Sequence, residues 1–435
     1  MSEQIEYVEL RFVDILGRLK AMTVPCNPAD TIDEVKKDSA LLDGTSLDGS
    51  SIVGLSMVEE SDLRLVPDPS TLVEVPYSAQ RVAAAMCFVR EKGGEEGRQS
   101  WYPLDSRGVL HAVCEKFLPG NMHLRVKVEP EFYFITDEGE PIDNAGYADT
   151  YPQSPSADIL LEIATAIQSV GMKPRVVHHE VGEAQQEIEI DYDDVRNMAD
   201  FIPIFKNLTR TVARGQDIDV TFMPKPFEGA AGSGLHCHLQ LWDGDQNLFG
   251  KEGGDLLSDT ARYFIAGLLE HAPAITAIAN PSINSYKRMV PHHEAPVYIT
   301  WGFRNRTALV RVPLFQDAQK ASAEFRSPDA TTNSYLLFSA IIAAGMDGVE
   351  RKLAPPEAQD RDIFSLTDEQ LVKRGIVTLP GSLGVALDNL ERNDVIRKAI
   401  GSEMLETFIR VKREEWREYA NEAVTDWEWR KYYSY

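Results

Sequence analysis

The sequence predicts an α+β protein with two domains, and three features of the chain lead to this expectation. With 435 residues, the chain is long enough to bury more than one core. Residues 1–100 alternate short strand-like segments with turns, and this part ends in the low-complexity stretch 90–99. The remainder mixes amphipathic helices with consecutive strands joined by turn residues, which favours an antiparallel sheet over βαβ units. We therefore expect domains at residues 1–100 and 101–435.

The spacing of apolar residues predicts four helices in the second domain. Residues 157–171 carry isoleucine and valine at helical spacing, and Gly171 suits the C-terminal end of a helix. Two further helices are expected near 195–214 and 259–270. Residues 333–346 are apolar nearly all round, so they predict a buried helix.

Composition excludes several classes of partner. The formal net charge of −24 argues against nucleic acid and anionic membranes. No apolar run reaches the length of a membrane span, and the first residues do not resemble a signal peptide. The cysteines lack metal or disulfide spacing, so we interpret them as reduced thiols in a cytoplasmic protein. They are Cys26, Cys87, Cys114 and Cys237.

Three short strings gather carboxylates and imidazoles. In residues 124–135 apolar and polar residues alternate, so Glu129 and Glu131 project from one face of a strand. The same alternation in 235–242 places His236 and His238 together. The string HHEVGEAQQE at 178–187 adds more glutamates. Such groups suit hard divalent cations such as Mg²⁺ or Mn²⁺, whereas any one string alone is also typical of a solvated strand face.

Arginines cluster in the segment 282–313. Arg304 and Arg306 are two residues apart, so in a strand they would share a face. Glu324 and Arg326 repeat this spacing farther on. A guanidinium group clamps carboxylate or phosphate oxygens, although a surface lattice of salt bridges would use the same residues.

The order of these strings resembles type I glutamine synthetase over nearly the whole chain. The matching segments include DGSS at 48–51, EPEF at 129–132, GSGLHCH at 232–238, NSYKRMVP at 284–291 and EFRSPD at 324–329. The resemblance implies a small N-terminal β-grasp-like domain and a large catalytic domain with a curved antiparallel sheet flanked by helices. It further implies an ATP-dependent ligase that joins ammonia to the γ-carboxylate of glutamate through γ-glutamyl phosphate.

The resemblance also implies roles for individual residues. The ligands of a first divalent cation would be Glu131, Glu180 and Glu187, and those of a second would be Glu129, His236 and Glu324. The residues for ATP would be His238 and Arg311; Arg306 and Arg326 would hold the transferred phosphoryl group and the glutamate carboxylate; Arg288 and Gly232 would contact glutamate. Two carboxylates, Asp48 and Glu294, would bind ammonium and accept its proton. Asp48 would enter the site of a neighbouring subunit, which implies a homo-oligomer, a dodecamer of two hexameric rings.

The sequence departs from the family pattern at a few positions. Ala231 replaces an asparagine on the loop that would contact glutamate, and Leu55 replaces an aromatic residue. Ala184 stands where glycine is usual, so we expect that turn to be rebuilt, because alanine takes a positive φ less cheaply. The expected flap carries His292 and His293 before Glu294.

Two other functions remain open from the sequence. A γ-glutamyl-amine ligase, which uses an amine larger than ammonia, would share every metal and phosphate residue. Asp48 and Glu294 favour ammonia, whereas the changes at residues 55, 231 and 292–293 favour a larger amine. A non-catalytic ring protein of the same fold would not need the full set of ligands and arginines.

Overall fold

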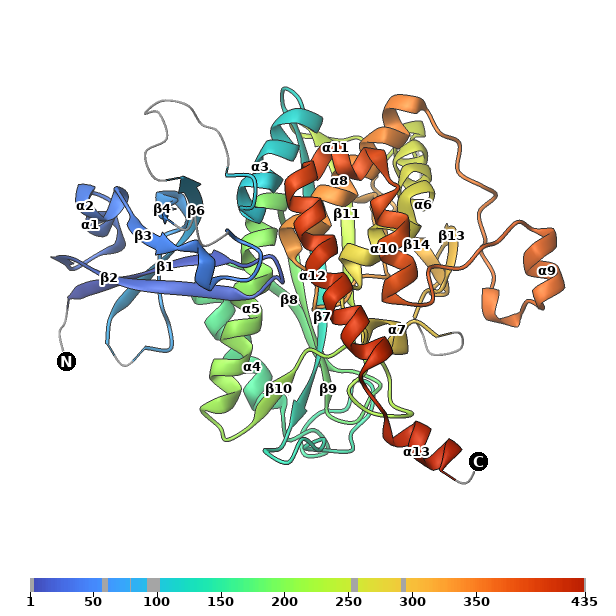
Figure 1. Ribbon diagram of the computed structural model, residues 1–435, viewed down its shortest axis with the longest axis horizontal. Coiled ribbons are helices and arrows are strands. Elements are labelled where there is room, and N and C mark those ends of the chain that lie inside the picture. Colours follow the sequence, from blue (N-terminus) through green and yellow to red (C-terminus); the bar gives the residue numbers. More distant parts are fainter. Residues whose placement is uncertain are drawn as a thin grey trace.

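The computed structural model describes residues 4–56, 62–78, 80–91, 102–251, 257–290 and 295–433. Two sheets of different size form the framework, and the N-terminal sheet lies at one end of the molecule (Figure 1). Within the described residues, no helix combines the length and the apolar character needed to cross a membrane.

The N-terminal sheet has six strands in the order β2-β1-β6-β4-β3, with β5 paired to β6. The strands are β1 (Ile5–Val13), β2 (Leu19–Ala29), β3 (Thr45–Asp48), β4 (Asp62–Pro67), β5 (Val73–Glu74) and β6 (Val82–Glu91). The short helices α1 (Ile32–Val35) and α2 (Ser39–Leu42) connect β2 to β3. The central pair, β1 and β6, is parallel, and the other pairs are antiparallel.

The larger sheet has nine strands in the order β13-β14-β15-β11-β7-β9-β8, with β10 on β7 and β12 on β11. The strands are β7 (Met122–Ile135), β8 (Pro174–His179), β9 (Gln185–Asp194), β10 (Asp219–Thr221), β11 (Leu235–Asp243), β12 (Gln246–Asn247), β13 (Tyr298–Phe303), β14 (Ala308–Val312) and β15 (Ala323–Phe325). All pairs are antiparallel except β13 with β14, so the sheet is mixed. The predicted α+β class is confirmed.

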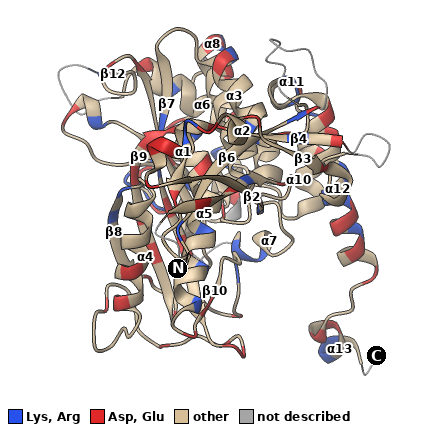
Figure 2. Ribbon diagram, turned by 90° about the vertical axis from the view of Figure 1, so that its left-hand side faces the viewer, with Lys and Arg blue, Asp and Glu red and all other residues tan. Residues whose placement is uncertain are grey.

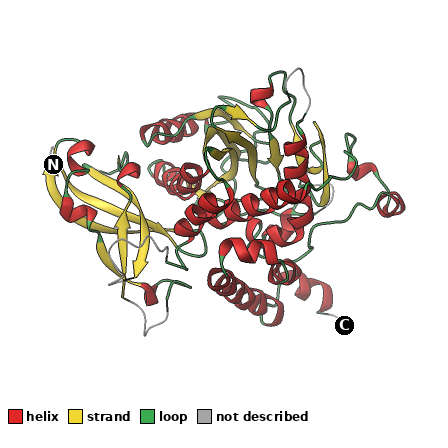
Figure 3. Cartoon of the chain, turned by 90° about the horizontal axis from the view of Figure 1, so that it is seen from above, coloured by secondary structure: helices red, strands yellow, loops and turns green. Residues whose placement is uncertain are grey.

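Helices lie mostly to one side of the larger set of strands (Figure 3). They are α3 (Ser106–Phe117), α4 (Ala157–Ser169), α5 (Val195–Arg214), α6 (Asp259–Ala279), α7 (Ser285–Arg288), α8 (Ser334–Arg351), α9 (Asp368–Lys373), α10 (Leu383–Glu391), α11 (Asp394–Ile400), α12 (Ser402–Asn421) and α13 (Asp426–Tyr432). The predicted helices at 157–171, 195–214 and 333–346 are confirmed. Gly171 follows α4 with a φ of 89°, as expected for the residue after a helix.

Helix α6 runs nine residues beyond its predicted end at 270, and it continues through Pro273. Its C-terminal half is buried almost all round, so its pattern lacks the polar face that marks an amphipathic helix. Tertiary packing against α8 sustains this half.

Two clusters of buried apolar side chains fill the molecule. One belongs to the N-terminal sheet and includes Val8, Leu65 and Val89. The other lies under the larger sheet and its helices, and it also takes in Val13, Ile15 and Met86. The expected boundary near residue 100 falls outside the described residues, so it stays a prediction.

Helices α6 and α8 approach each other through glycines. A Cβ atom on Gly267 would lie 2.0 Å from the carbonyl oxygen of Ala344 and 2.9 Å from the amide nitrogen of Gly348. We expect Gly267→Ala to lower the free energy of unfolding by about 1–3 kcal/mol, because backbone atoms cannot move aside as a side chain does. Urea denaturation at fixed protein concentration measures this change. Gly381→Ala is the control, because its Cβ would meet nothing within 4 Å; equal effects of both changes would contradict the close approach.

Candidate active site

A polar cavity of about 150 Å³ lies on one face of the larger sheet. The apolar side chains of the same strands are buried on the opposite face. Its walls come from β7, β8, β9 and β11 and from the segments after α7 and β13. The lining residues are Glu129, Glu131, Tyr147, His178, Glu180, Gln185, Glu187, Glu189, Ala231, Gly232, His236, Arg288, Ala295, Arg306, Arg311 and Arg326. We call this space the catalytic cavity.

The alternation of β7 places its glutamates in this cavity. Glu129 and Glu131 both line it, while Val128, Phe132 and Phe134 are fully buried in the core behind the sheet. The predicted shared face of the two glutamates is confirmed. Strand β9 repeats the pattern, since Glu187 and Glu189 line the cavity between buried isoleucines.

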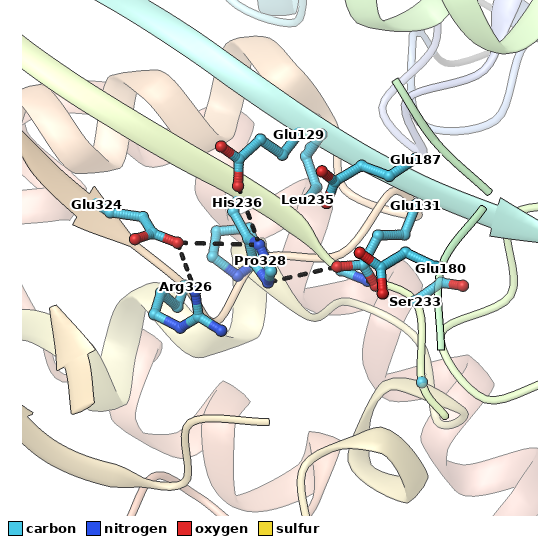
Figure 4. Close-up of polar contacts among 12 residues, drawn as sticks. Glu129, Glu131, Glu180, Glu187, Ser233, Leu235, His236, Glu324, Arg326 and Pro328 are labelled. Carbon is cyan, nitrogen blue, oxygen red and sulfur yellow. Dashed lines mark hydrogen bonds and ion pairs between the residues drawn. The ribbon is translucent and has the colours of Figure 1, made fainter. Parts of the chain in front are cut away.

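Pairing of β11 with β7 brings the histidines to these glutamates. His236 lies directly opposite Glu129 in the antiparallel register. Its Nδ1 is 3.4 Å from a carboxylate oxygen of Glu129 and 3.9 Å from one of Glu324, and its Nε2 is 3.7 Å from one of Glu131 (Figure 4). One imidazole therefore lies within 4 Å of three glutamates, two from β7 and one from β15, which are far apart in sequence.

His238 lies deeper on the same strand. Its Nε2 is 2.8 Å from a carboxylate oxygen of Glu129 and 4.0 Å from one of Glu324. It is buried and does not line the catalytic cavity itself. Its expected contact with ATP therefore stays a prediction.

Three groups of residues bring ligand atoms close enough to share a cation. Each group places its ligand atoms within 4.8 Å of one another: Glu129 with His238 and Glu324, Glu129 with Glu187 and His236, and His178 with Glu180 and Glu187. All six ligands expected from the sequence lie at or beside this site, but the structure divides them differently. It adds His178 and His238, and Glu131 belongs to none of the three groups.

Two charged residues at the site were missed by the sequence analysis. His178 lies 3.1 Å from Glu187 through its Nε2, and Lys127 forms ion pairs with Glu129 and Glu189. In both cases the alternation of side chains along a strand could have predicted that the residue faces the site. Lys127 is two residues before Glu129, and His178 is two residues before Glu180.

Burial and the charge of neighbouring carboxylates raise the pKa of two carboxyl groups in the cavity. Burial raises the pKa of Glu131 to about 7, and the charge of Glu180 acts in the same direction. Burial likewise raises the pKa of Glu187 to about 7, where the charges of Glu131 and Glu129 add to the effect. These two carboxyl groups thus hold protons near neutral pH that a cation would displace.

Two arginines pair with Glu324 behind the cavity. Glu324 is fully buried between Arg326 and Arg311 and forms ion pairs with both. Burial alone would raise the pKa of Glu324, but Arg326, His238 and Arg311 outweigh it and lower the pKa to about 2. Arg326 and Arg311 both line the cavity, so their remaining N–H groups are available to anionic oxygens there.

One prediction about the arginines is wrong. Arg304 and Arg306 do not share a strand face, because they lie in the connection between β13 and β14, and Arg304 has a φ of 59°. Only Arg306 lines the cavity.

The loop that carries Gly232 and Gly234 can approach Arg288 because these two positions have no side chain. A Cβ atom on Gly232 would lie 2.5 Å from Cγ of Arg288 and 2.9 Å from the carbonyl oxygen of Pro224. A Cβ atom on Gly234 would lie 2.6 Å from a guanidinium nitrogen of the same arginine. Arg288 itself donates from Nη1 to the carbonyl oxygen of Ser327 over 2.7 Å. Side-chain-free positions therefore fix this guanidinium at the cavity wall.

Ala184 corrects another expectation. The turn is not rebuilt, since Ala184 adopts the left-handed conformation with a φ of 57°. Its amide donates to Asp143 over 3.0 Å and its carbonyl oxygen accepts from the amide of Phe134 over 3.1 Å. These hydrogen bonds hold the conformation despite the cost of a side chain.

Of the two residues expected to bind ammonium, the structure describes only Asp48, which does not line the catalytic cavity. Asp48 is exposed at the end of β3, where it accepts hydrogen bonds from the hydroxyls of Ser50 and Ser51. These hydroxyls lower the pKa of Asp48, so it remains negatively charged. Glu294, with the flap histidines, falls outside the described residues.

Comparison with known proteins gives one family over the whole chain. The family model "Glutamine synthetase, beta-Grasp domain" matches residues 4–92, and "Glutamine synthetase, catalytic domain" matches residues 103–432. The β-grasp expectation for the N-terminal part is thereby confirmed.

Relatives and solved structures agree with this match. The chain is 42% identical to a glutamine synthetase of Pyrococcus abyssi, over 98% of this chain and 96% of that one. It is 38% identical to a glutamine synthetase of Methanocaldococcus jannaschii, over 100% and 96%. A solved structure described as "Apo GmaS without ligand" superposes with a TM-score of 0.84 at 32% identity, over 99% and 97%. A glutamine synthetase of Plasmodium falciparum gives a TM-score of 0.85 at 25% identity, over 99% and 96%.

Cation affinity at this site is expected to depend on pH. Because Glu131 and Glu187 have a pKa of about 7, they are protonated below that pH and must lose their protons to bind Mn²⁺. Affinity should rise between pH 6 and pH 8, by up to about tenfold per pH unit for each proton released. Calorimetric titration with Mn²⁺ in two buffers of different ionisation enthalpy measures both affinity and proton release.

Glu187→Gln tests the assignment, since it should weaken binding and flatten the pH dependence. Glu183→Gln is the matched control, because Glu183 is exposed in the same string. A pH dependence that is the same in Glu187→Gln and in the unmodified protein would show that the released proton comes from elsewhere.

Proposed function

The chain belongs to the glutamine synthetase family, and we propose that it is an ATP-dependent ligase that joins ammonia to the γ-carboxylate of glutamate. The observation that carries this proposal is the combination in one cavity of clustered carboxylates with Arg288, Arg306 and Arg326. Carboxylates hold divalent cations, and arginines hold phosphate and carboxylate oxygens.

The reaction divides into two steps. The γ-carboxylate of glutamate first attacks the terminal phosphorus of ATP, which forms γ-glutamyl phosphate and releases ADP. Ammonia then attacks the acyl carbon, and inorganic phosphate leaves. Activation is needed because an oxide ion is a poor leaving group and phosphate is a good one.

Each wall of the cavity has a task in this proposal. Arg288 and the backbone of the loop at Gly232 hold glutamate, and Arg326 and Arg306 hold the phosphoryl group in transfer. Arg311 binds the nucleotide together with His238. The glutamates and His236 would hold Mg²⁺ or Mn²⁺, which when bound would supply positive charge to neutralise the phosphate oxygens.

The acceptor arrives mainly as ammonium at neutral pH and must lose a proton before it attacks. Two carboxylates outside the metal set, Asp48 and Glu294, are proposed to attract the cation and take the proton. Asp48 suits this task because its hydrogen bonds with Ser50 and Ser51 keep it ionised and oriented.

Catalysis by Asp48 requires a second subunit. It does not line the cavity of its own chain, and it is exposed at the far end of the N-terminal sheet. Helix α13 projects from the rest of the molecule, and Trp427, Trp429 and Tyr433 on and beside it are each at least 54% exposed (Figure 1). Aromatic side chains of this kind favour burial against another subunit. We propose a homo-oligomer, a dodecamer of two hexameric rings.

A cytoplasmic location is part of the proposal. All four cysteines are free thiols, and three of them are buried. Glutamate, ammonium and ATP would be its small-molecule partners, without nucleic acid or membrane.

An amine larger than ammonia is the second candidate acceptor. The specific observation is Ala231, whose methyl group lines the cavity where the family has a longer side chain. Leu55 does not contribute to this space in its own chain, because it is buried in the N-terminal core.

Release of ADP in a coupled assay separates the two acceptors. With Mg²⁺, ATP and glutamate present, we expect ammonium to support turnover and methylamine, ethylamine or a polyamine to support little. Turnover with an amine and none with ammonium would replace the proposal by the larger-amine ligase.

Glu324→Gln should lose at least about a hundredfold in kcat, because it removes a charge that holds both cation and arginine.

Gly232 is expected to control glutamate affinity. Gly232→Ala places a methyl group against Arg288 and should raise the KM for glutamate by about tenfold or more, because it displaces the guanidinium. The KM for ATP should change little. Gly146→Ala, which adds a methyl group near Tyr147 without a clash, is the control. An unchanged KM for glutamate would remove Arg288 and Gly232 from the glutamate site.

Sedimentation with mixed subunits tests the shared site. We expect Asp48→Ala to assemble normally yet make little glutamine. Mixing Asp48→Ala with Glu324→Gln should restore part of the activity, because some sites then receive Asp48 and Glu324 from different chains. A fully active monomer of 48.6 kDa would contradict the proposal.

A further inference from the structure

A second cavity, of about 550 Å³, lies where the turn between β1 and β2 meets α5 and α12. It shares no lining residue with the catalytic cavity. Its charged side chains are Arg18, Lys206, Arg210, Lys412 and Glu415. We call it the α5 basic cavity.

The charge of this cavity is opposite to that of the whole chain. It has four cationic side chains and one carboxylate, whereas the protein carries a formal net charge of −24. Basic residues along α5 appear blue in Figure 2. Lys412 forms an ion pair with Glu415. Within the part of the chain that the structure describes, Arg18, Lys206 and Arg210 form no ion pair.

The nearest other acids are already engaged. Asp14 and Asp329 act on Lys206 through space without contacting it. Asp14 accepts backbone hydrogen bonds from Leu16 and Arg18, and Asp329 accepts from Asn280 and Thr331. These neutral donors leave both carboxylates charged, so Asp14 and Asp329 offset part of the positive charge without forming an ion pair with Lys206.

Two of the cations are held in place. The Nζ of Lys206 donates to the carbonyl oxygen of Ala330 over 2.8 Å, and the guanidinium of Arg210 lies over the ring of Phe222 at 4.9 Å from its centroid. Burial, together with the charge of Arg210, lowers the pKa of Lys206 to about 8. Burial is the main cause of this lowered pKa, and Asp329 and Asp14 oppose it only in part.

The remaining walls combine apolar residues, namely Leu16, Leu19, Phe222, Met223 and two prolines, with the polar residues Asn207, Thr221, Ser282 and Thr331. A volume in this range is typical of small-molecule sites, which combine apolar walls with a few charged groups. The lysine and arginine side chains among its walls are the usual partners of carboxylate and phosphate.

We propose that the α5 basic cavity binds a small organic oxyanion, either a phosphate monoester or a carboxylate, and that this site is coupled to the glutamate end of the catalytic cavity. The coupling rests on the function proposed above, whereas anion binding does not. A small molecule fits better than an acidic segment of a protein, because the cationic groups line a cavity of small-molecule size.

The coupling follows from two segments of backbone that connect the walls of the two cavities. Thr221, Phe222 and Met223 line the basic cavity, and the next residue, Pro224, accepts a hydrogen bond from the amide of Ser233 over 2.9 Å. That hydrogen bond holds the loop that carries Gly232.

A second segment makes the same connection. Ser282 lines the basic cavity, and its hydroxyl bonds to that of Ser285 in α7, the helix that ends in Arg288. Lys206 also holds Ala330, two residues beyond Pro328, whose carbonyl oxygen accepts from Arg288. An anion that draws Lys206 and Arg210 inward would move the supports of Gly232 and Arg288.

Crystals of the full chain soaked in selenate locate the site directly. We expect an anomalous peak between Lys206 and Arg210, whatever the activity of the enzyme. Lys206→Met and Arg210→Met should each remove or weaken that peak. Arg214→Met is the matched control, because Arg214 is an exposed arginine on the same helix that pairs with Asp219 outside the cavity.

Calorimetric titration then identifies the ligand chemistry. Inorganic phosphate and malonate are the two probes, and tighter binding of one of them assigns the phosphate or the carboxylate class. Loss of a charged hydrogen-bond donor in Lys206→Met or Arg210→Met should weaken binding by roughly tenfold or more. Arg326→Met reports any binding in the catalytic cavity, and it should leave the affinity of the basic cavity unchanged.

Titration of glutamate with and without saturating probe tests the coupling. By linkage, the anion must change glutamate affinity by the same factor as glutamate changes anion affinity, and we expect at least a threefold change, roughly the low end for coupled sites. A selenate peak in the catalytic cavity alone, or anion affinities that Lys206→Met and Arg210→Met leave unchanged, would overturn the site. A peak in the basic cavity with unchanged glutamate affinity would overturn the coupling. A protein that binds the anion but makes no glutamine would contradict only the proposed function.

Discussion

Mutual repulsion among the glutamates of the catalytic cavity is the constraint on which the rest of the site depends. Five glutamates from β7, β9 and the turn before β9 line one small space, and Glu324 lies directly behind it. Buried carboxylates are unfavourable unless cations or hydrogen bonds compensate them. The glutamates of this site differ in how strongly cationic and hydrogen-bonding partners stabilise their charge. This difference divides the site into two ends.

At one end protein side chains already balance the charge. Lys127, His236 and His238 hold the pKa of Glu129 well below its ordinary value although burial opposes this, and arginines do the same for Glu324. At the other end the partners of Glu131 and Glu187 do not outweigh burial and the repulsion of neighbouring carboxylates, and the pKa of each rises to about 7. Divalent cations are most strongly favoured where carboxylates repel one another, because there they replace protons.

Steric room is the second requirement. Arg288 reaches the cavity only because positions 232 and 234 carry no side chain. Its guanidinium is further tied to backbone carbonyl oxygens of the segment after β15. The same segment continues into the wall of the α5 basic cavity. Binding groups of the catalytic cavity thus rest on backbone that a second ligand site can also reach.

Local periodicity in the sequence determined much of the fold and part of the site. The alternation in β7 and β11 placed Glu129 with Glu131 and His236 with His238, because side chains in a strand point to opposite faces in turn. Helical spacing located α4, α5 and α8. The expected family followed from the order of several specific strings.

Contacts between distant segments were decided only by the tertiary structure. Strand register brought His236 to Glu129, and it recruited Lys127 and His178, whose roles no single segment shows. Arg304 and Arg306 were misplaced because their spacing describes a strand, whereas their backbone turns. Ala184 keeps a left-handed turn through hydrogen bonds to Asp143 and Phe134 that lie far from it in sequence. A sequence pattern reports the preference of each segment, and only packing decides which partner each segment meets.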